Sequence, residues 1–218
     1  MTDNRGTGST CSAEIIGPHH LLTAAHCLEF REFGQTLKVL DPASEKYFRA
    51  RIDKVVTHPL YKKGFHDAPT LQAAGADIAV VMLKSEINFT YQISPLITDE
   101  ILRDLPDKPE ALLVANGENE DHHSLENRPL EIVISNFTIN SGQELLQPKL
   151  SYYAVTAQGG GPCEGDSGGG LFIRHRNQYY LAAIQSIKTA SKECGMINTY
   201  GYAVPFNAIL DWIIPLLK

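Results

Sequence analysis

The sequence predicts an all-β protein with one helix at its C-terminus. Short runs rich in β-branched and aromatic residues recur along the 218 residues, and turn dipeptides such as Gly-Pro, Asp-Pro, His-Pro and Asn-Gly separate them. Many short strands with few stretches of helical spacing are typical of a β-barrel or a β-sandwich. The final segment, beyond Pro205, instead repeats apolar residues at helical spacing.

The clearest strand signals follow one another along the whole chain. They are Ser12–Ile16, Leu37–Leu40, Tyr47–Val56, Ile78–Leu83, Ala111–Ala115, Glu131–Phe137, Ser151–Thr156, Leu171–Arg174, Tyr179–Ile187 and Gly201–Val204. The stretch Ser94–Glu110 is rich in proline and acidic residues, so we expect it to cross between two halves of the molecule. The expected C-terminal helix carries the apolar set Phe206, Ile209, Leu210, Ile213 and Ile214, and Pro215 should end or bend it.

The composition is that of an ordinary globular chain. Hydrophobic residues make up 43% and charged residues 20%, which excludes a disordered protein. The net charge of −6 gives no electrostatic reason to expect nucleic acid or an anionic membrane as a partner. No apolar run approaches the roughly 20 residues of a membrane-spanning helix. The polar start Met1–Thr10 is not a secretory signal peptide, so we expect either that one has been removed or that export uses another route.

Three separate segments supply the side chains that a nucleophilic serine requires. His26 lies in Leu22–Cys27, Asp77 precedes the apolar run Ile78–Leu83, and Ser167 lies in the run Gly165–Gly170, whose small residues are typical of a tight turn. A serine hydroxyl is a poor nucleophile at neutral pH, and it needs a base to take its proton and a carboxylate to orient that base. Considered singly, the same residues would be a structural histidine, a turn aspartate and a glycine-rich surface turn.

The segments TAAHC around His26, DIAVVML from Asp77 and CEGDSGGG from Cys163 resemble the trypsin/chymotrypsin-like serine peptidases. The resemblance runs from about Cys11 to the C-terminus. It implies two six-stranded antiparallel β-barrels, residues 1–98 and 99–218, with the active site between them and a C-terminal helix.

The resemblance also implies a role for each residue of the site. His26 would be the general base, Asp77 would orient it, and Ser167 would be the nucleophile. The backbone amides of Gly165 and Ser167 would form the oxyanion hole. No metal or cofactor is required, and the implied activity is that of a serine endopeptidase. The expected partners are protein or peptide substrates and protein inhibitors of proteases.

The four cysteines allow three disulfide pairings. The resemblance selects Cys11–Cys27 beside the histidine, and Cys163–Cys194, which would tie the serine loop to a neighbouring loop. These disulfides would place the protein in an oxidising compartment, secreted or periplasmic. The alternative is four reduced thiols in a cytosolic protein, although no Cys-x-x-Cys spacing suggests a metal site.

Asp166 departs from the family's usual arrangement. In the family, a freed Ile-Val-Gly-Gly-like N-terminus buries its ammonium group against this aspartate, and no such tetrapeptide stands near the start of this sequence. An unpaired buried carboxylate is costly. We therefore expect a missing activating end, a different cation beside Asp166, or a disordered oxyanion hole. In the last case the protein would be a binding or regulatory protein with a protease fold, or a zymogen-like inactive form.

Substrate preference depends on residues of the second half. Gly161 falls where trypsin-like enzymes carry the aspartate that binds arginine or lysine, so we expect no strong preference for a basic P1 residue. Lys188 would narrow the pocket, attract an acidic side chain, or remain a solvated loop lysine. The full set expected to line or edge the pocket is Gly161, Pro162, Ser186, Ile187, Lys188 and Gly201.

Overall fold

The structure is a computed structural model. It describes residues 11–29, 36–41, 44, 46–61, 76–89, 91–106, 109–117, 130–134, 136–140, 152–156, 162–188, 200–205 and 209–218.

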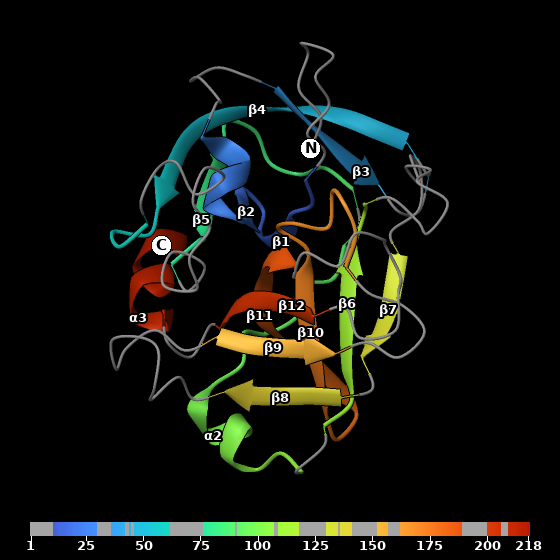
Figure 1. Cartoon of the computed structure of the whole chain (residues 1–218). Helices are drawn as coiled ribbons and strands as arrows, with labels where there is room; N and C mark the ends of the chain where they lie inside the picture. The colour runs from blue at the N-terminus through green and yellow to red at the C-terminus, as the bar shows by residue number, and fades with distance from the viewer. Residues whose placement is uncertain are drawn as a thin grey trace.

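The first half of the chain forms a five-stranded antiparallel sheet in the order β1-β2-β5-β4-β3. Strand β4 arches over the top of Figure 1; its first half pairs with β3 and its second half pairs with β5, and the pairing with β5 has a register shift between Ile52 and Lys54. A single 3-10 turn, η1 (Ala25–Leu28), follows the second strand. The strands are β1 (Glu14–Gly17), β2 (His20–Thr23), β3 (Thr36–Asp41), β4 (Lys46–Thr57) and β5 (Ala79–Leu83).

The second half forms a seven-stranded antiparallel sheet in the order β7-β6-β10-β11-β12-β9-β8. Its two outermost strands, β7 and β8, are consecutive in the chain and separated by one residue, so the chain itself brings the two ends of the sheet together. The strands are β6 (Ala111–Ala115), β7 (Leu130–Ile134), β8 (Asn136–Asn140), β9 (Tyr152–Thr156), β10 (Gly170–His175), β11 (Gln178–Lys188) and β12 (Tyr200–Pro205).

The predicted all-β class with a C-terminal helix is confirmed, and within the described residues the two antiparallel sheets contain five and seven strands. Strand β4 is one continuous strand that pairs with both β3 and β5 of the first sheet. The run predicted as the single strand Glu131–Phe137 is divided into β7 and β8. Strand β2 was not predicted, because its sequence His20–Thr23 leads directly into the histidine motif without a turn signal of its own.

Strand β5 is buried on both faces. Val80 belongs to the core shared by the two sheets, whereas Ala79 and Val81 belong to a core inside the first sheet. Successive side chains of a strand point to opposite faces, so a strand between two cores needs a continuous apolar run rather than alternation. Asp77 stands directly before this run, at the seam between the two sheets.

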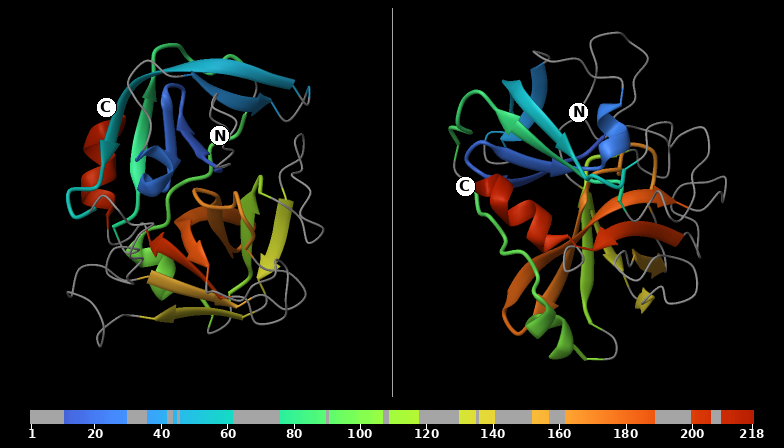
Figure 2. Two further views of the ribbon diagram at one scale, coloured as in Figure 1. Left: turned by 45° about the horizontal axis from the view of Figure 1, so that its top comes forward. Right: turned by 90° about the vertical axis from the view of Figure 1, so that its left-hand side faces the viewer.

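The C-terminal helix returns to the first sheet, as both views in Figure 2 show. Helix α3 (Leu210–Ile213) is followed by the 3-10 turn η3 (Ile214–Leu217), so the α-helix ends just before Pro215, as predicted. Ile213 is buried in the shared core, and the Trp212 ring meets His58 edge-on at 5.1 Å. Phe206 lies outside the described residues.

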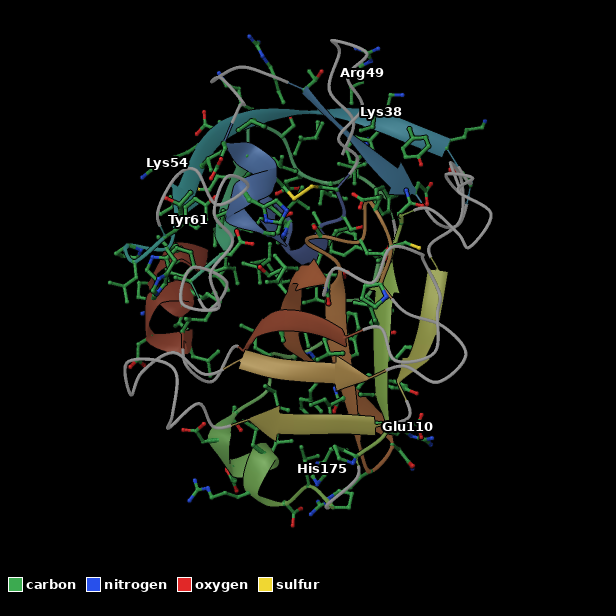
Figure 3. All side chains as sticks on the ribbon, viewed as in Figure 1. Lys38, Arg49, Lys54, Tyr61, Glu110 and His175 are labelled. Carbon is green, nitrogen blue, oxygen red and sulfur yellow. A yellow bond between two sulfur atoms is a disulfide. The ribbon has the colours of Figure 1, made fainter. Side chains whose placement is uncertain are left out.

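The crossing Ser94–Glu110 contains a short helix that the sequence did not predict. Helix α2 (Asp99–Arg103) begins after Thr98, whose hydroxyl oxygen accepts a hydrogen bond from the Ile101 amide. Figure 3 places His175 and Glu110 at this end of the molecule. His175 and Arg176 of the β10–β11 hairpin contact the Asp104 carboxylate at 2.8 and 3.2 Å. The hydrogen bond from His175, with the charge of Arg176, lowers the pKa of Asp104.

Candidate active site

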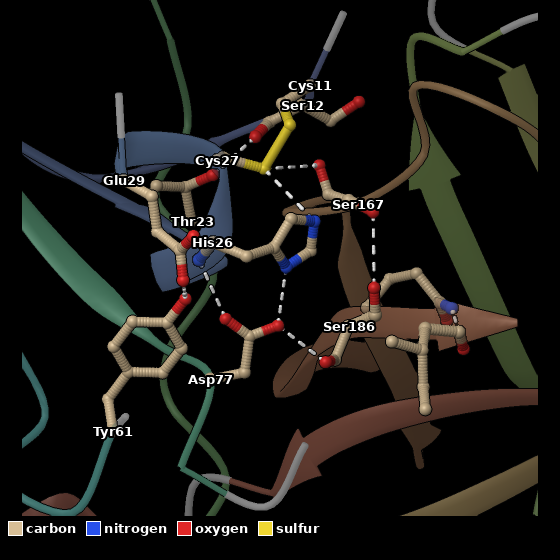
Figure 4. Close-up of polar contacts among 12 residues, drawn as sticks. Cys11, Ser12, Thr23, His26, Cys27, Glu29, Tyr61, Asp77, Ser167 and Ser186 are labelled. Atoms are coloured by element: carbon tan, nitrogen blue, oxygen red, sulfur yellow. Dashed lines mark hydrogen bonds and ion pairs between the residues drawn. A yellow bond between two sulfur atoms is a disulfide. The ribbon is translucent and has the colours of Figure 1, made fainter. Parts of the chain in front are cut away.

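Asp77 is a fully buried carboxylate that accepts three hydrogen bonds. Its Oδ1 accepts from the His26 backbone amide at 2.8 Å. Its Oδ2 accepts from His26 Nδ1 and from the Ser186 hydroxyl, each at 2.6 Å (Figure 4). Because a carboxylate can only accept, Nδ1 of the imidazole carries the proton. In the neutral ring, Nε2 is then the nitrogen with the lone pair.

His26 is held in place from its own short turn. It lies in η1, and its side chain is 6% exposed. The next residue, Cys27, is joined by a disulfide to Cys11, which lies three residues before β1. Its Nε2 lies 3.7 Å from the Sγ atom of Cys27. Tyr61 stands nearby and donates a hydrogen bond to the Glu29 carboxylate, and burial raises the pKa of its hydroxyl.

Ser167 lies in a tight loop that precedes β10. The loop contains two glycines in the left-handed region, Gly165 with φ 90° and Gly168 with φ 87°. This conformation suits glycine, because it has no Cβ. The Ser167 hydroxyl donates to the Ser186 carbonyl oxygen at 3.1 Å. Gly168 donates to the Gln185 carbonyl at 2.8 Å, which holds the loop against β11.

The amides predicted to form the oxyanion hole are available as donors. Neither the Gly165 nor the Ser167 N–H donates to an acceptor within the described part of the chain. The Glu164 carbonyl oxygen, on the same peptide as the Gly165 N–H, faces Gly117, where it would lie 2.5 Å from an added Cβ. In a trans peptide the C=O and N–H point in opposite directions, so the Gly165 N–H points away from Gly117.

Asp166 is fully buried and hydrogen-bonded to backbone. Its Oδ1 accepts from the Gly117 amide at 3.1 Å and its Oδ2 from the Cys163 amide at 2.7 Å. Backbone amides that donate to a carboxylate stabilise its charged form. The sequence left three alternatives for Asp166, a missing activating end, a different cation or a disordered oxyanion hole. It gave no means of finding these two donors, because every residue except proline carries an amide.

Ser12, which precedes β1, and Glu14, which begins it, contact the same loop although neither was predicted as a site residue. Ser12 is 7% exposed and bonds to both Gly165 and Ser167. Glu14 accepts a hydrogen bond from the Gly170 amide at 2.8 Å, and burial raises its pKa to about 7. Their position three or fewer residues after Cys11 was the available signal, since the resemblance places that cysteine beside the histidine.

The predicted pocket residues are described in part. Ser186, Ile187 and Lys188 follow one another on β11, and the sheet register pairs Lys188 with Gly201 on β12. Ser186 directs its hydroxyl to Asp77. Pro162 is buried at the start of the serine loop. Gly161 lies outside the described residues.

The predicted disulfide Cys11–Cys27 is present, with its Cα atoms 6.2 Å apart. Cys163 is also disulfide-bonded, and Cys194, its expected partner, lies outside the described residues. Cys11, His26 and Cys27 bring potential metal-ligand atoms within 4.8 Å of one another. Both sulfurs are engaged in the disulfide and offer no thiolate, so we assign no metal to this group.

Two packed antiparallel sheets with a buried histidine–aspartate pair and a serine loop at their seam define a domain of the serine-peptidase type. The sequence model of the Trypsin family matches residues 1–213, and the chain belongs to this family of trypsin-like serine peptidases.

Curated relatives agree with this assignment. Mouse transmembrane protease serine 11G is 28% identical over 93% of this chain and 48% of its own length. The Spaetzle-processing enzyme of Drosophila melanogaster is 26% identical over 93% of this chain and 57% of its own length. The chain therefore spans about half the length of these relatives. Among the described residues, no helix is long and apolar enough to cross a membrane.

Proposed function

We propose that this protein is a serine endopeptidase that hydrolyses peptide bonds through an acyl-enzyme. The observation that carries the proposal is the buried 2.6 Å contact between His26 Nδ1 and Asp77, beside the loop of Ser167. His26 Nε2 would take the Ser167 proton as Oγ attacks the substrate carbonyl carbon, and would then give that proton to the leaving amine. In the second stage, His26 would take a proton from a water molecule as the water attacks the acyl-enzyme. His26 would then give that proton to Ser167 Oγ as the acyl group leaves.

Asp77 and the loop amides would stabilise the charges that form during these steps. The Asp77 carboxylate would stabilise the imidazolium and keep the ring in the productive tautomer. The amides of Gly165 and Ser167 would donate to the oxyanion of the tetrahedral intermediate. Since the Ser167 hydroxyl donates to the Ser186 carbonyl in the resting structure, its proton must turn toward His26 Nε2 before attack, which rotation about the Cβ–Oγ bond allows.

An inactive, zymogen-like form or a protease-fold binding protein is the second candidate. The same hydrogen bond from Ser167 to Ser186 favours it, because a hydroxyl proton given to a carbonyl is not at that moment given to the base. Measuring the reactivity of Ser167 separates the two candidates.

For specificity, we propose that uncharged or acidic P1 residues are preferred over arginine and lysine. The support is Gly161 at the position where trypsin-like enzymes carry an aspartate, with Lys188 among the residues that the resemblance places at the edge of the pocket. A panel of peptides that differ only at P1 tests this. Efficient cleavage after arginine would show that the Gly161 assignment is wrong.

We also propose an extracellular or periplasmic location, with protein substrates and protein inhibitors as partners. The Cys11–Cys27 disulfide supports an oxidising compartment. Finally, we propose residues 1–98 and 99–218 as the two structural units, a boundary that falls at the cap of α2.

The deciding experiment is intact-mass labelling of the folded protein with a fluorophosphonate, which reacts with an activated serine. We expect one adduct on the wild type and none on the Ser167→Ala variant, with thermal stability nearly unchanged. Turnover of peptides should fall by about 10⁶-fold in that variant. A folded wild type that takes up no label would favour the inactive form.

A further inference from the structure

We propose that Ser12 is a positioning residue for the oxyanion hole, and that its hydroxyl fixes the peptide group that follows Gly165. This inference rests on the proposed function, because it assigns a residue to the same site. It starts from the contacts of Ser12, which lies in the first half of the chain and binds a loop of the second half.

The Ser12 hydroxyl both accepts and donates a hydrogen bond. It accepts from the Asn116 amide at 2.8 Å and donates to the Gly165 carbonyl oxygen at 3.0 Å. Because the Asn116 amide can only donate, the hydroxyl proton is directed to Gly165. A side chain in this place must therefore accept and donate together, as a serine does and an alanine cannot.

The backbone of Ser12 is fixed by the same two regions. Its N–H donates to the Ser167 carbonyl at 2.8 Å, and its carbonyl accepts from the Thr23 hydroxyl at 2.7 Å. Gly168 packs so closely that an added Cβ would lie 2.2 Å from the Ser12 carbonyl oxygen and 2.2 Å from Thr23 Oγ1. The backbone from which the Ser12 hydroxyl projects is therefore held in place, and the hydroxyl can support Gly165 in a defined position.

Gly165 needs such a support. With φ 90° it occupies backbone space that glycine explores freely, so its two flanking peptides can rotate unless something holds them. The preceding peptide is confined by Gly117, against which the Glu164 carbonyl lies. The following peptide is held through its carbonyl by Ser12. Together these contacts keep the Gly165 N–H aimed where an oxyanion would form.

Asn116 and Gly117 join this arrangement to Asp166. The Asn116 amide donates to the Ser12 hydroxyl, which in turn holds Gly165. The Gly117 amide donates to the Asp166 carboxylate, so two consecutive donors act on the loop at Gly165 and at Asp166. Removing the Ser12 hydroxyl would leave the Asn116 amide and the Gly165 carbonyl without this link, while Asp166 would keep its contact with Gly117.

The test compares wild type with Ser12→Ala, using a peptide aldehyde and the carboxamide of the same peptide. The aldehyde forms an oxyanion on the serine, and the carboxamide binds without one. We expect the aldehyde affinity and kcat to fall by about 10- to 100-fold, less than the loss of an oxyanion donor itself. The carboxamide affinity and KM should change by less than about twofold, because ground-state contacts are retained.

Two controls separate positioning from general damage. Ser44→Ala removes another hydroxyl that donates a hydrogen bond, at an exposed turn position between β3 and β4, and should leave both affinities unchanged. Ser12→Gly should reproduce Ser12→Ala. Equal loss of aldehyde and carboxamide affinity, or no loss of either, would overturn the assignment.

A crystal structure of Ser12→Ala gives a readout that does not need turnover. We expect the Gly165–Asp166 peptide to rotate or to lose its defined orientation. An unchanged peptide would refute the role of Ser12 even in an active enzyme. A wild type that neither turns over peptides nor binds the aldehyde would refute the proposed function instead, and the peptide orientation would still decide the structural part of the inference.

Discussion

Asp77 and Asp166 are both completely buried, yet the structure uses them differently. Asp77 accepts from a histidine ring and a serine hydroxyl, groups that can move and can exchange protons. Among the described contacts of Asp166 are two backbone amides, which can do neither. The comparison teaches that the donors around a buried carboxylate, more than its burial, decide whether it supports chemistry or holds a loop.

Replacing each aspartate by asparagine should separate the two roles. In Asp77→Asn the amide can donate to His26 Nδ1 and impose the wrong tautomer, so kcat should fall by about 10⁴-fold with little loss of stability. In Asp166→Asn one amide donor would face an NH₂ group, which costs about 1–3 kcal/mol of unfolding free energy. Steady-state kinetics and denaturant titration of both variants measure this. Equal losses of stability would contradict the distinction.

Gly117→Ala should disturb the Asp166 side alone. Its Cβ would lie 2.3 Å from Asp166 Oδ1 and 2.5 Å from the Glu164 carbonyl, so the serine loop must shift. We expect a loss of about 1–3 kcal/mol of unfolding free energy and slower labelling by the fluorophosphonate. Gly17→Ala is the matched control, because its Cβ would meet only the His20 side chain, at 3.1 Å. Labelling rates that agree for the two variants would argue against the role of Gly117.

Glu14 extends the comparison to a third carboxylate, whose effect is on the pH dependence of stability. Burial raises its pKa from 4.5 to about 7 in the folded protein. Between these values the folded state holds a proton that the unfolded state has released, so the unfolding free energy should fall as the pH rises from about 4.5 to about 7. Glu14→Gln keeps the acceptor for Gly170 and should remove this slope. Urea titrations across that pH range provide the measurement, and an unchanged slope in the variant would assign it to other groups.

The sequence was sufficient for the strand-rich class and for proposing His26, Asp77 and Ser167 as the reactive residues. Local patterns carried this information: the uninterrupted apolar run after Asp77 indicated a buried strand, and β5 is such a strand. Helix α2 escaped prediction because five residues are too few for a helical period to emerge, and strand β2 because it runs into the histidine motif without a turn signal between them. The division of strands into five and seven depended on where β4 bends and where β7 ends, which turn residues alone do not fix.

Tertiary structure alone decided how the serine loop is held. The hydroxyl of Ser12 and the carbonyl of Gly165 are 153 positions apart, and Ser12 and Asn116 are 104 positions apart. Most of the partners in this network are backbone amides and carbonyls, which nearly all residues share and which therefore leave no mark in a sequence. The sequence determined which side chains can perform the chemistry, and the packing of the two sheets determined which backbone groups hold them in place.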